Sequence, residues 1–543
     1  MATGSSAVNT RKWRAAVYKA APFVFGLAVV GFFYFYHLGT PVLWGDEADT
    51  GVFANNVLQY GYPYCYDGRN LTFYGGGIVH SKKLINVLVS WFPFYVGALS
   101  VQLFGQSAFG LRALFVVFAT LSFLPLYGIL KKNYYNPLLL SILFLLTPQV
   151  LLFQRNARYY PILIFSYVAL LYYLSTDYQT KTKDFVVGAL CFTLLFHTHQ
   201  FSAMTASGAF FLYLLITRSL QKNRIKLSAC LFGIATLVAW SWAHGEKFAR
   251  QPLVIDMAKG DFWGWVGVSG HNILYYIIDL DLVNSLPIIL IMGLAICGWI
   301  KHGTNYPRLL FADPVVLFLC VHLIIHVTLS AATFGLETEA NYSILRYMPH
   351  MVLGGYLLLA RLIQIVSGSK EMALCLVVCA IVSNIFTLSY WSHPRASHPP
   401  VSWWGRVYAE ILFPPQDSWQ TILSHVKSHK QDASGNEVIM IFPDYLNELF
   451  IFYLGSDYLI KPPVEAGSDK EKSITTIIGE SAMQAVQQAP AWVISFFPFD
   501  EYPAQYTAES LPFYRQTPDA TRPELTRHYF YDQDNPQYVY LYH

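Results

Sequence analysis

Residues 22–49 read PFVFGLAVVGFFYFYHLGTPVLWGDEAD, an apolar run followed directly by two adjacent carboxylates. The run has the composition of a segment that enters a membrane, and Asp46 and Glu47 stand where the chain should emerge. Charged groups at that depth are costly, so they indicate chemistry. The alternative is that Asp46 caps a following interfacial helix, a position that Asp favours. We favour the first interpretation, because other reactive groups are expected on the same side of the membrane.

The composition of the whole chain extends this interpretation. The chain has 543 residues, of which 13% are charged, and its mean hydropathy is +0.37. A soluble protein of this size could not bury so much apolar surface in one core. We therefore predict a polytopic α-helical membrane protein. The net charge of +3 is small and there is no long basic run, which argues against nucleic acid as a partner.

Eleven apolar runs are long enough to cross, or nearly cross, a bilayer. They lie near residues 20–38, 108–130, 136–153, 160–176, 184–198, 200–217, 226–243, 283–300, 313–333, 347–365 and 372–391. Residues 84–104 are also apolar, and the loop charges decide how to treat them. If this stretch lies in the interface or re-enters, the basic loops share one side with the N-terminus, as the positive-inside tendency requires. We therefore predict eleven spans, with the N-terminus inside and the C-terminus outside.

This topology brings unusual polar residues from six separate segments to the external face, which is the pattern expected of a site. They are Asp46, Glu47, His80, Lys82, Lys83, Arg155, Arg158, His197, His199, Glu337, Glu339 and Arg346. We expect residues 1–391 to form the transmembrane catalytic domain, in which 39–107 are a first external loop with juxtamembrane helices. Residues 392–543 should form a small external α/β domain. Its predicted elements are helices at 419–427 and 445–454 and strands at 438–442, 491–496 and 538–542.

The two adjacent carboxylates cannot easily act on one atom, because a helix that begins here would rotate them about 100° apart. We predict that Asp46 is the catalytic base and that Glu47 has a structural or supporting role at the substrate site. Residues 50–58 carry a helical apolar stripe suited to lying on the membrane.

Basic residues at the same face form a predicted phosphate clamp. Arg155 and Arg158, followed by Tyr159, end the third span, and arginine offers a fork of donors that fits phosphate oxygens. Their alternative role is snorkelling to the headgroups. The same argument applies to Lys82, Lys83 and Arg346.

Histidines are the remaining candidates for substrate contacts. His197 and His199 are two residues apart, which places their rings on opposite sides of a helix and makes a weak metal motif. A substrate contact by His199 and polar packing at a span end both remain open. His80, in the first external loop, is a second possible substrate contact.

The order of these features resembles the GT-C glycosyltransferases, in particular the branch with the protein O-mannosyltransferases and the aminoarabinose transferases of lipid A. The resemblance rests on an acidic pair after the first span, Arg and Tyr closing the third, a late Arg346-Tyr-Met-Pro349 and an external C-terminal domain. It implies that Asp46 deprotonates or orients the acceptor. It also implies that Lys82 or Lys83, Arg155 or Arg158, and Arg346 hold the phosphate of the lipid donor.

The implied reaction is transfer of a hexosyl or pentosyl group from a polyprenyl-phosphate-linked donor to a hydroxyl of a lipid, glycan or protein, with inversion, on the external face. Such a phosphate leaves readily and needs charge neutralisation more than a general acid. We expect no required cofactor, with a divalent metal left open. The expected location is the bacterial inner membrane, with the C-terminal domain periplasmic. The alternatives are a transporter or flippase for a lipid-linked sugar, which would show repeat symmetry and midplane charges, and a membrane-anchored binding protein.

Overall fold

The computed structural model describes most of the helical region and the central part of the C-terminal domain. The described residues are 4–72, 84–86, 89–134, 136–178, 180–244, 262–282, 287–333, 349–367, 369–383, 408, 411–414, 418–428, 438–442, 447–455, 458–460, 492–495, 508–513 and 537–542.

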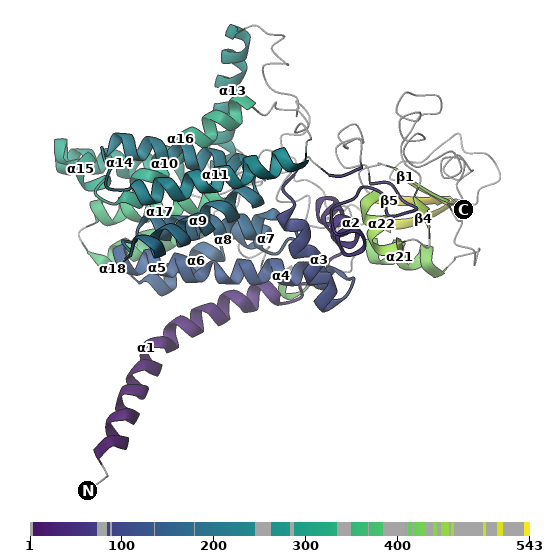
Figure 1. The fold of residues 1–543 in the computed structure, drawn as a ribbon, viewed down its shortest axis with the longest axis horizontal. Helices are drawn as coiled ribbons and strands as arrows, with labels where there is room; N and C mark the ends of the chain where they lie inside the picture. Colours follow the sequence, from purple (N-terminus) through teal and green to yellow (C-terminus); the bar gives the residue numbers. More distant parts are fainter. Residues whose placement is uncertain are drawn as a thin grey trace.

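A bundle of helices packed side by side makes up most of the molecule (Figure 1). Its helices are α1 (Gly4–Phe35), α4 (Ala108–Leu121), α5 (Phe123–Asn133), α6 (Pro137–Leu145), α7 (Pro148–Gln154), α8 (Tyr159–Leu174), α9 (Lys181–Thr198), α10 (Gln200–Ile216), α11 (Arg224–His244), α13 (Phe262–Leu282), α14 (Ile288–His302), α15 (Tyr306–Leu310), α16 (Pro314–Thr333), α17 (Pro349–Val366) and α18 (Lys370–Val382), with a 3₁₀ turn η2 (Gly303–Asn305). The first half of α1 projects away from the bundle.

Polar residues at the junctions end one helix and begin the next. Ser107 accepts a hydrogen bond from the backbone of Gly110 at the start of α4, and Thr180 does the same for Lys183 at the start of α9. Asn136 caps α6 in the same way and adopts a left-handed backbone, φ 49°. Such side chains satisfy backbone N–H groups that have no partner inside the helix.

Each of the eleven predicted spans overlaps a helix or a pair of consecutive helices, and residues 283–286, 347–348 and 384–391 of three of them lie outside the described residues. By length and composition, four stretches of the described residues are suited to crossing a membrane, Ala108–Lys132, Arg224–Ala243, Ile288–Leu310 and Pro314–Ala332, and several shorter apolar helices accompany them. The predicted polytopic helical membrane fold is thus confirmed. The sequence analysis did not predict α13, a further helix of 21 residues.

The first loop contains two helices, α2 (Gly45–Tyr60) and α3 (Phe92–Phe104). α3 has 13 residues, so it extends only about 20 Å, short of the roughly 30 Å of a bilayer core. This length favours the prediction that 84–104 does not cross. The prediction that the apolar stripe of α2 lies on the membrane is wrong for most of its residues. Val52, Phe53 and Val57 are buried in a core shared with α3 and the C-terminal domain, and only Leu58 is exposed.

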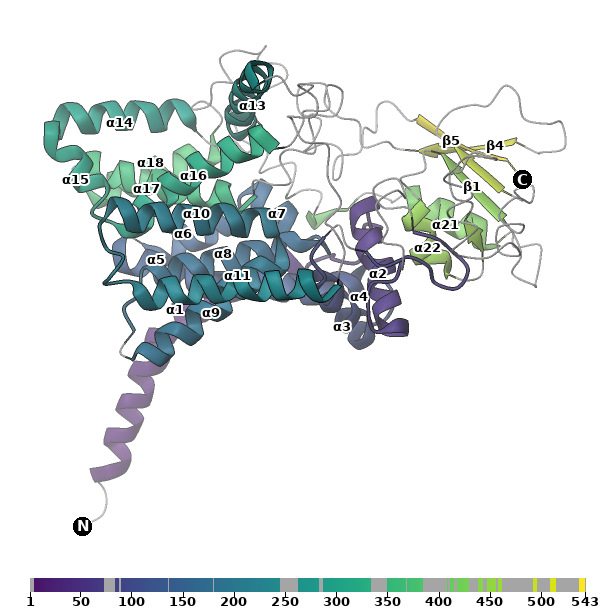
Figure 2. The same ribbon diagram turned by 45° about the horizontal axis from the view of Figure 1, so that its top comes forward.

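The C-terminal domain contains a five-stranded sheet with the order β2-β1-β3-β5-β4. Its strands are β1 (Val438–Phe442), β2 (Leu459–Ile460), β3 (Trp492–Ser495), β4 (Ala508–Phe513) and β5 (Gln537–Tyr542). β1 pairs in parallel with β2 and β3, whereas β5 is antiparallel to β3 and β4. Helices α21 (Ser418–Ser428) and α22 (Asn447–Leu454) lie on the sheet side that faces α2 and α3 (Figure 2). The three predicted strands and both predicted helices are present, whereas β2 and β4 were not foreseen.

The first loop and the C-terminal domain are joined by a common core and by hydrogen bonds. Asn70 donates to the carbonyl groups of Gly455 and Tyr458 and accepts a bond from the backbone of Ile460. Gln106 donates to the carbonyl of Phe452. These contacts hold the C-terminal domain over the start of α2, where the two adjacent carboxylates lie.

Candidate active site

The start of α2 positions Asp46 and Glu47 in the first helical turn. Trp44 precedes the helix, and its backbone N–H donates to Glu47 Oε2 at 3.4 Å, so Glu47 closes a capping box. The N-terminus of a helix carries a partial positive charge, which stabilises both carboxylates. The predicted helix start is therefore present, and from it the side chains of Asp46 and Glu47 point in different directions.

Glu47 is fully buried and is held by Arg112 of α4. Arg112 Nε donates to Glu47 Oε1 at 2.8 Å, and Arg112 Nη2 donates to Glu47 Oε2 at 2.5 Å. The backbone N–H of Ala157 also donates to Glu47 Oε1, at 2.6 Å. The same guanidinium donates to the carbonyl groups of Leu38 and Pro41. The bonds of Glu47 and Arg112 thus connect α2 to α4, to the α7–α8 junction and to the loop after α1. The contacts of Glu47 are therefore structural.

Arg112 was missed by the sequence analysis. A single arginine inside an otherwise apolar span was the signal that could have found it, because an ionisable residue at that depth needs a partner.

Asp46 differs from Glu47 in its exposure. Its side chain is 18% exposed, and its Oδ2 lies 3.9 Å from Arg158 Nη2. Arg158 is buried, and its Nη1 donates to Asp49 Oδ2 and to the backbone carbonyl of Asp46, each at 2.9 Å. Arg158 thus holds the first turn of α2 and leaves the Asp46 carboxylate at the surface of the charge network.

Asp49 is the buried carboxylate of this network, with an exposed fraction of 2%. Burial raises its pKa well above the usual value, and Glu448 of α22 raises it too, although Arg158 acts in the opposite direction. A carboxyl group that is enclosed in this way is a poor candidate to meet an acceptor. The sequence analysis gave it no role.

Arg155 also bonds to the protein. Its Nη1 donates to the carbonyl groups of Phe33 at 2.5 Å and Tyr34 at 3.1 Å, at the end of α1. Carbonyl groups there have no partner inside the helix, and a cation near them is stabilising. Gln154, the preceding residue, is fully buried, and neither atom of its amide has a hydrogen bond.

Tyr159 and His199 lie together beside Arg158. Their rings are stacked with centroids 4.5 Å apart, and the Arg158 guanidinium lies 5.9 Å from the Tyr159 ring. His199 begins α10 and pairs through Nδ1 with Ser202 Oγ at 2.7 Å. Burial, and then the neighbouring His326 and Arg158, lower the pKa of His199 to about 3, so the ring is neutral near pH 7.

The structure therefore brings Asp46, Glu47, Arg158, Tyr159 and His199 to one end of the bundle, with Arg155 at the adjoining end of α1. His197 contacts Thr236 of α11 instead, through Nε2 at 3.3 Å. The predicted residues His80, Lys82, Lys83, Glu337, Glu339 and Arg346 lie outside the described residues.

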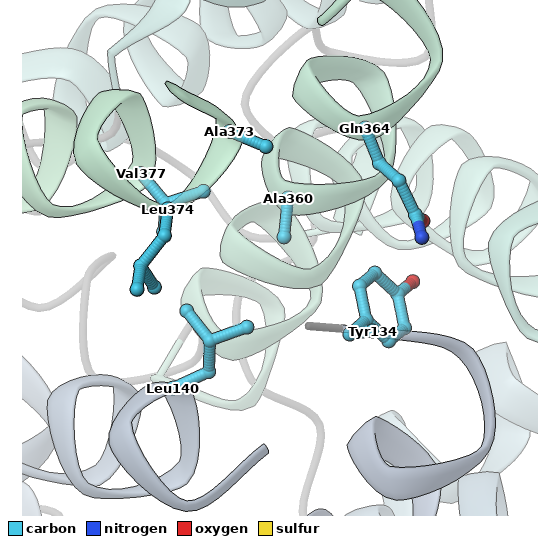
Figure 3. A pocket seen from close by; sticks show the side chains of 7 residues that line it. All are labelled: Tyr134, Leu140, Ala360, Gln364, Ala373, Leu374 and Val377. Atoms are coloured by element: carbon cyan, nitrogen blue, oxygen red, sulfur yellow. The ribbon is translucent and has the colours of Figure 1, made fainter. Parts of the chain in front are cut away.

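A pocket at another part of the bundle does not share these features (Figure 3). It lies between α6, α17 and α18, and no carboxylate, imidazole or guanidinium group lines it. The lining residues are Tyr134, Leu140, Ala360, Gln364, Ala373, Leu374 and Val377. Because the pocket lacks the charged groups that the proposed chemistry uses, the carboxylate end of the bundle remains the candidate site.

Comparison with known proteins identifies relatives in sequence and fold. Residues 89–242 match the model of the dolichyl-phosphate-mannose-protein mannosyltransferase family. No curated protein matches the chain in sequence. ArnT from Cupriavidus metallidurans in the apo state has a similar fold, with a TM-score of 0.50 and 10% identity over 89% of this chain and 93% of that chain. ArnT bound to undecaprenyl phosphate has a TM-score of 0.47 and 13% identity over 88% and 93%. Residues 89–242 thus resemble a mannosyltransferase family in sequence, and the chain as a whole shares the fold of apo ArnT.

Proposed function

We propose that this membrane protein is a glycosyltransferase, which transfers a hexosyl or pentosyl group from a polyprenyl-phosphate-linked donor to a hydroxyl of a lipid, glycan or protein. Asp46 accepts the hydroxyl proton while the acceptor oxygen attacks the anomeric carbon. The bond from that carbon to the phosphate oxygen breaks, and the polyprenyl phosphate leaves with the bonding electrons. A single displacement of this kind inverts the configuration of the anomeric carbon.

The contrast between the carboxylates at the start of α2 carries this proposal. Glu47 and Asp49 are buried and bonded to arginines, whereas the side chain of Asp46 keeps 18% of its surface exposed. A general base must come within hydrogen-bond reach of the proton that it removes. Asp46 is the one of these three that an acceptor can reach.

The donor class is supported by the family model, whose description names a dolichyl-phosphate-linked mannose. Of the predicted phosphate ligands, Arg155 and Arg158 already bond to carbonyl or carboxylate groups. Their contacts favour positioning roles, in which Arg158 orients Asp46. We therefore assign the donor phosphate chiefly to Lys82, Lys83 and Arg346. Glu47 supports the site from within, and His80 and His199 remain proposed substrate contacts.

The proposed setting is the bacterial inner membrane, with the N-terminus cytoplasmic and the C-terminal domain periplasmic. The contacts of the C-terminal domain with the first loop support a site on that external face, because they place the domain beside Asp46. The proposed reaction requires no cofactor.

Asp46→Asn tests the proposal. The amide keeps the size of the side chain but cannot accept the proton, so transfer should fall by roughly a hundredfold or more while donor binding is retained. The matched control is Asp177→Asn, an exposed carboxylate in the loop between α8 and α9. Sugar transfer and polyprenyl-phosphate binding should be measured on the same preparations. If Asp46→Asn transfers sugar at the wild-type rate, Asp46 is not the base.

A further inference from the structure

Three buried histidines meet where α16 packs against the start of α17. His322, His326 and His350 each have no exposed surface, and one ring nitrogen from each lies within 4.8 Å of the others. His322 and His326 are four residues apart on α16, so both project from the same helix face. His350 is the second residue of α17. Two helices thus present three imidazoles to one point.

The ring nitrogens of His350 are buried without a hydrogen-bond partner. Neither Nδ1 nor Nε2 of its ring has a hydrogen bond, although the side chain is fully buried. Burying polar groups without a partner is costly, and nearly all such groups in proteins find one. The ring centroid of His350 lies 4.9 Å from that of His326 and 5.9 Å from that of His322. A ligand placed among the three rings would give His350 its partner.

Hydroxyl groups around the cluster orient the other two rings. Thr205 of α10 donates to the carbonyl of Ser202, which leaves its oxygen to accept from His322 Nε2 at 3.1 Å and His326 Nδ1 at 2.8 Å. The Tyr167 hydroxyl pairs with His322 Nδ1 at 2.8 Å. Histidines that bind metals commonly donate their second ring N–H to an oxygen in this way, which fixes the tautomer. The hydroxyl groups of Thr205 and Tyr167 thus fix the orientation of the His322 and His326 rings.

We propose that His322, His326 and His350 bind a late first-row transition metal ion of the Zn²⁺ class. Neutral imidazoles suit Zn²⁺, Cu²⁺ and Ni²⁺, whereas Mg²⁺ and Ca²⁺ require oxygen ligands that this cluster does not supply. Metal binding by His322 requires that one of its ring nitrogens exchange its bond to Tyr167 or to Thr205 for the metal. Three protein ligands leave a further coordination position for water or another oxygen ligand.

The cluster lies close to the candidate active site. Phe201, which follows His199 by two residues, packs against His326 with ring centroids 5.3 Å apart. His199 in turn stacks on Tyr159, next to Arg158. The proposed glycosyl transfer needs no metal, so the metal site is an addition to that function and does not depend on it.

Metal content tests the proposal directly. The full-length chain, purified with a tag that contains no histidine, should hold a stoichiometric transition metal by elemental analysis. His350→Ala and His322→Ala should lose most of it. His302→Ala is the matched control, because His302 at the end of α14 bonds through Nε2 to the carbonyl of Ile365, away from the cluster. Thr205→Val should keep the metal but release it to weaker chelators.

A second measurement uses the wild-type chain alone and remains informative if a variant fails to fold. Chelator-treated protein should gain thermal stability on addition of ZnCl₂ but not MgCl₂, because a ligand that binds only the folded state stabilises it. Addition of Co²⁺ should give the visible absorption of a site with nitrogen ligands. The proposal is overturned if the stripped wild-type protein shows neither response, or if folded His350→Ala protein binds Co²⁺ as the wild type does.

Discussion

Glu47 and Asp46 at the start of α2 are neighbours in sequence, but they differ in burial and therefore in the role that we assign to each. Glu47 lies inside, where both of its oxygens accept bonds from Arg112, and Asp46 stays at the edge, 3.9 Å from Arg158. A buried ion pair of this kind contributes little net stability over an apolar pair, but breaking it leaves an uncompensated charge. Its clearest effect is to fix the backbone that carries Asp46.

Glu47→Gln should therefore destabilise the fold, whereas Asp46→Asn should not. The amide leaves the buried Arg112 guanidinium without a counter-charge, which costs about 3 kcal/mol or more. Asp46 is partly exposed and its ion pair is long, so its loss should cost about 1 kcal/mol or less. The unfolding free energy of both variants can be measured by SDS titration in mixed micelles. Equal losses in the two variants would contradict the proposed division between them.

The sequence predicted part of this site. A helix start at Gly45 implies that adjacent side chains diverge, and the divergence is present. The sequence alone could not indicate that Arg112 pairs with Glu47 or that Arg158 pairs with Asp49, because those partners are 65 and 109 residues apart in the chain. The predicted phosphate clamp treated the arginines as free for ligand, whereas Arg155 bonds to the end of α1. Pairings over such distances follow from tertiary packing alone.

At the scale of elements, the close approach of α2 to α22 decides where the C-terminal domain rests. A Cβ atom at Gly51 would lie 2.5 Å from Cδ2 and 2.6 Å from Cε2 of the Phe452 ring. Glycine therefore permits an aromatic ring to lie directly on the helix. The long apolar spans were predictable because each is an almost continuous apolar run. The apolar residues of α2 were misinterpreted, because a stripe that meets another domain has the same pattern as one that meets lipid.

Gly51→Ala should loosen the contact between α2 and α22. The added methyl group overpacks the contact with Phe452, at a cost of about 1–3 kcal/mol. Gly208→Ala is the matched control, since its Cβ would meet nothing within 4 Å, and alanine in a helix should gain about 0.5–1 kcal/mol. Thermal unfolding and limited proteolysis of the C-terminal domain measure the effect. Adding Phe452→Leu to Gly51→Ala should restore much of the loss, and an unchanged melting temperature in Gly51→Ala would show that the contact is unimportant.

At the scale of the whole molecule, charge is sorted along the bundle. Lys132 and Lys226 both donate to the end of α8, to carbonyl groups of residues 173–176, and Lys301 donates to the carbonyl of Val366 at the end of α17. Lysines at the last carbonyl groups of helices are stabilising. The carboxylates of α2 lie at the start of α8, one helix length away from Lys132. Basic ends of this kind face the cytoplasm in most membrane proteins, which is the basis of the predicted orientation.

Labelling of single cysteines tests that orientation in intact cells. In a cysteine-free variant, Lys131→Cys at the end of α5 should be shielded from an impermeant external reagent. A cysteine at Ser428, the exposed end of α21, should react with it, because the C-terminal domain is expected outside. Permeabilised cells provide the control, since both sites must then react. Strong labelling at position 131 with protection at 428 would mean that residues 84–104 cross the membrane and that every later loop lies on the opposite side. The 13 residues of α3 are too few for such a crossing, so we expect the first pattern.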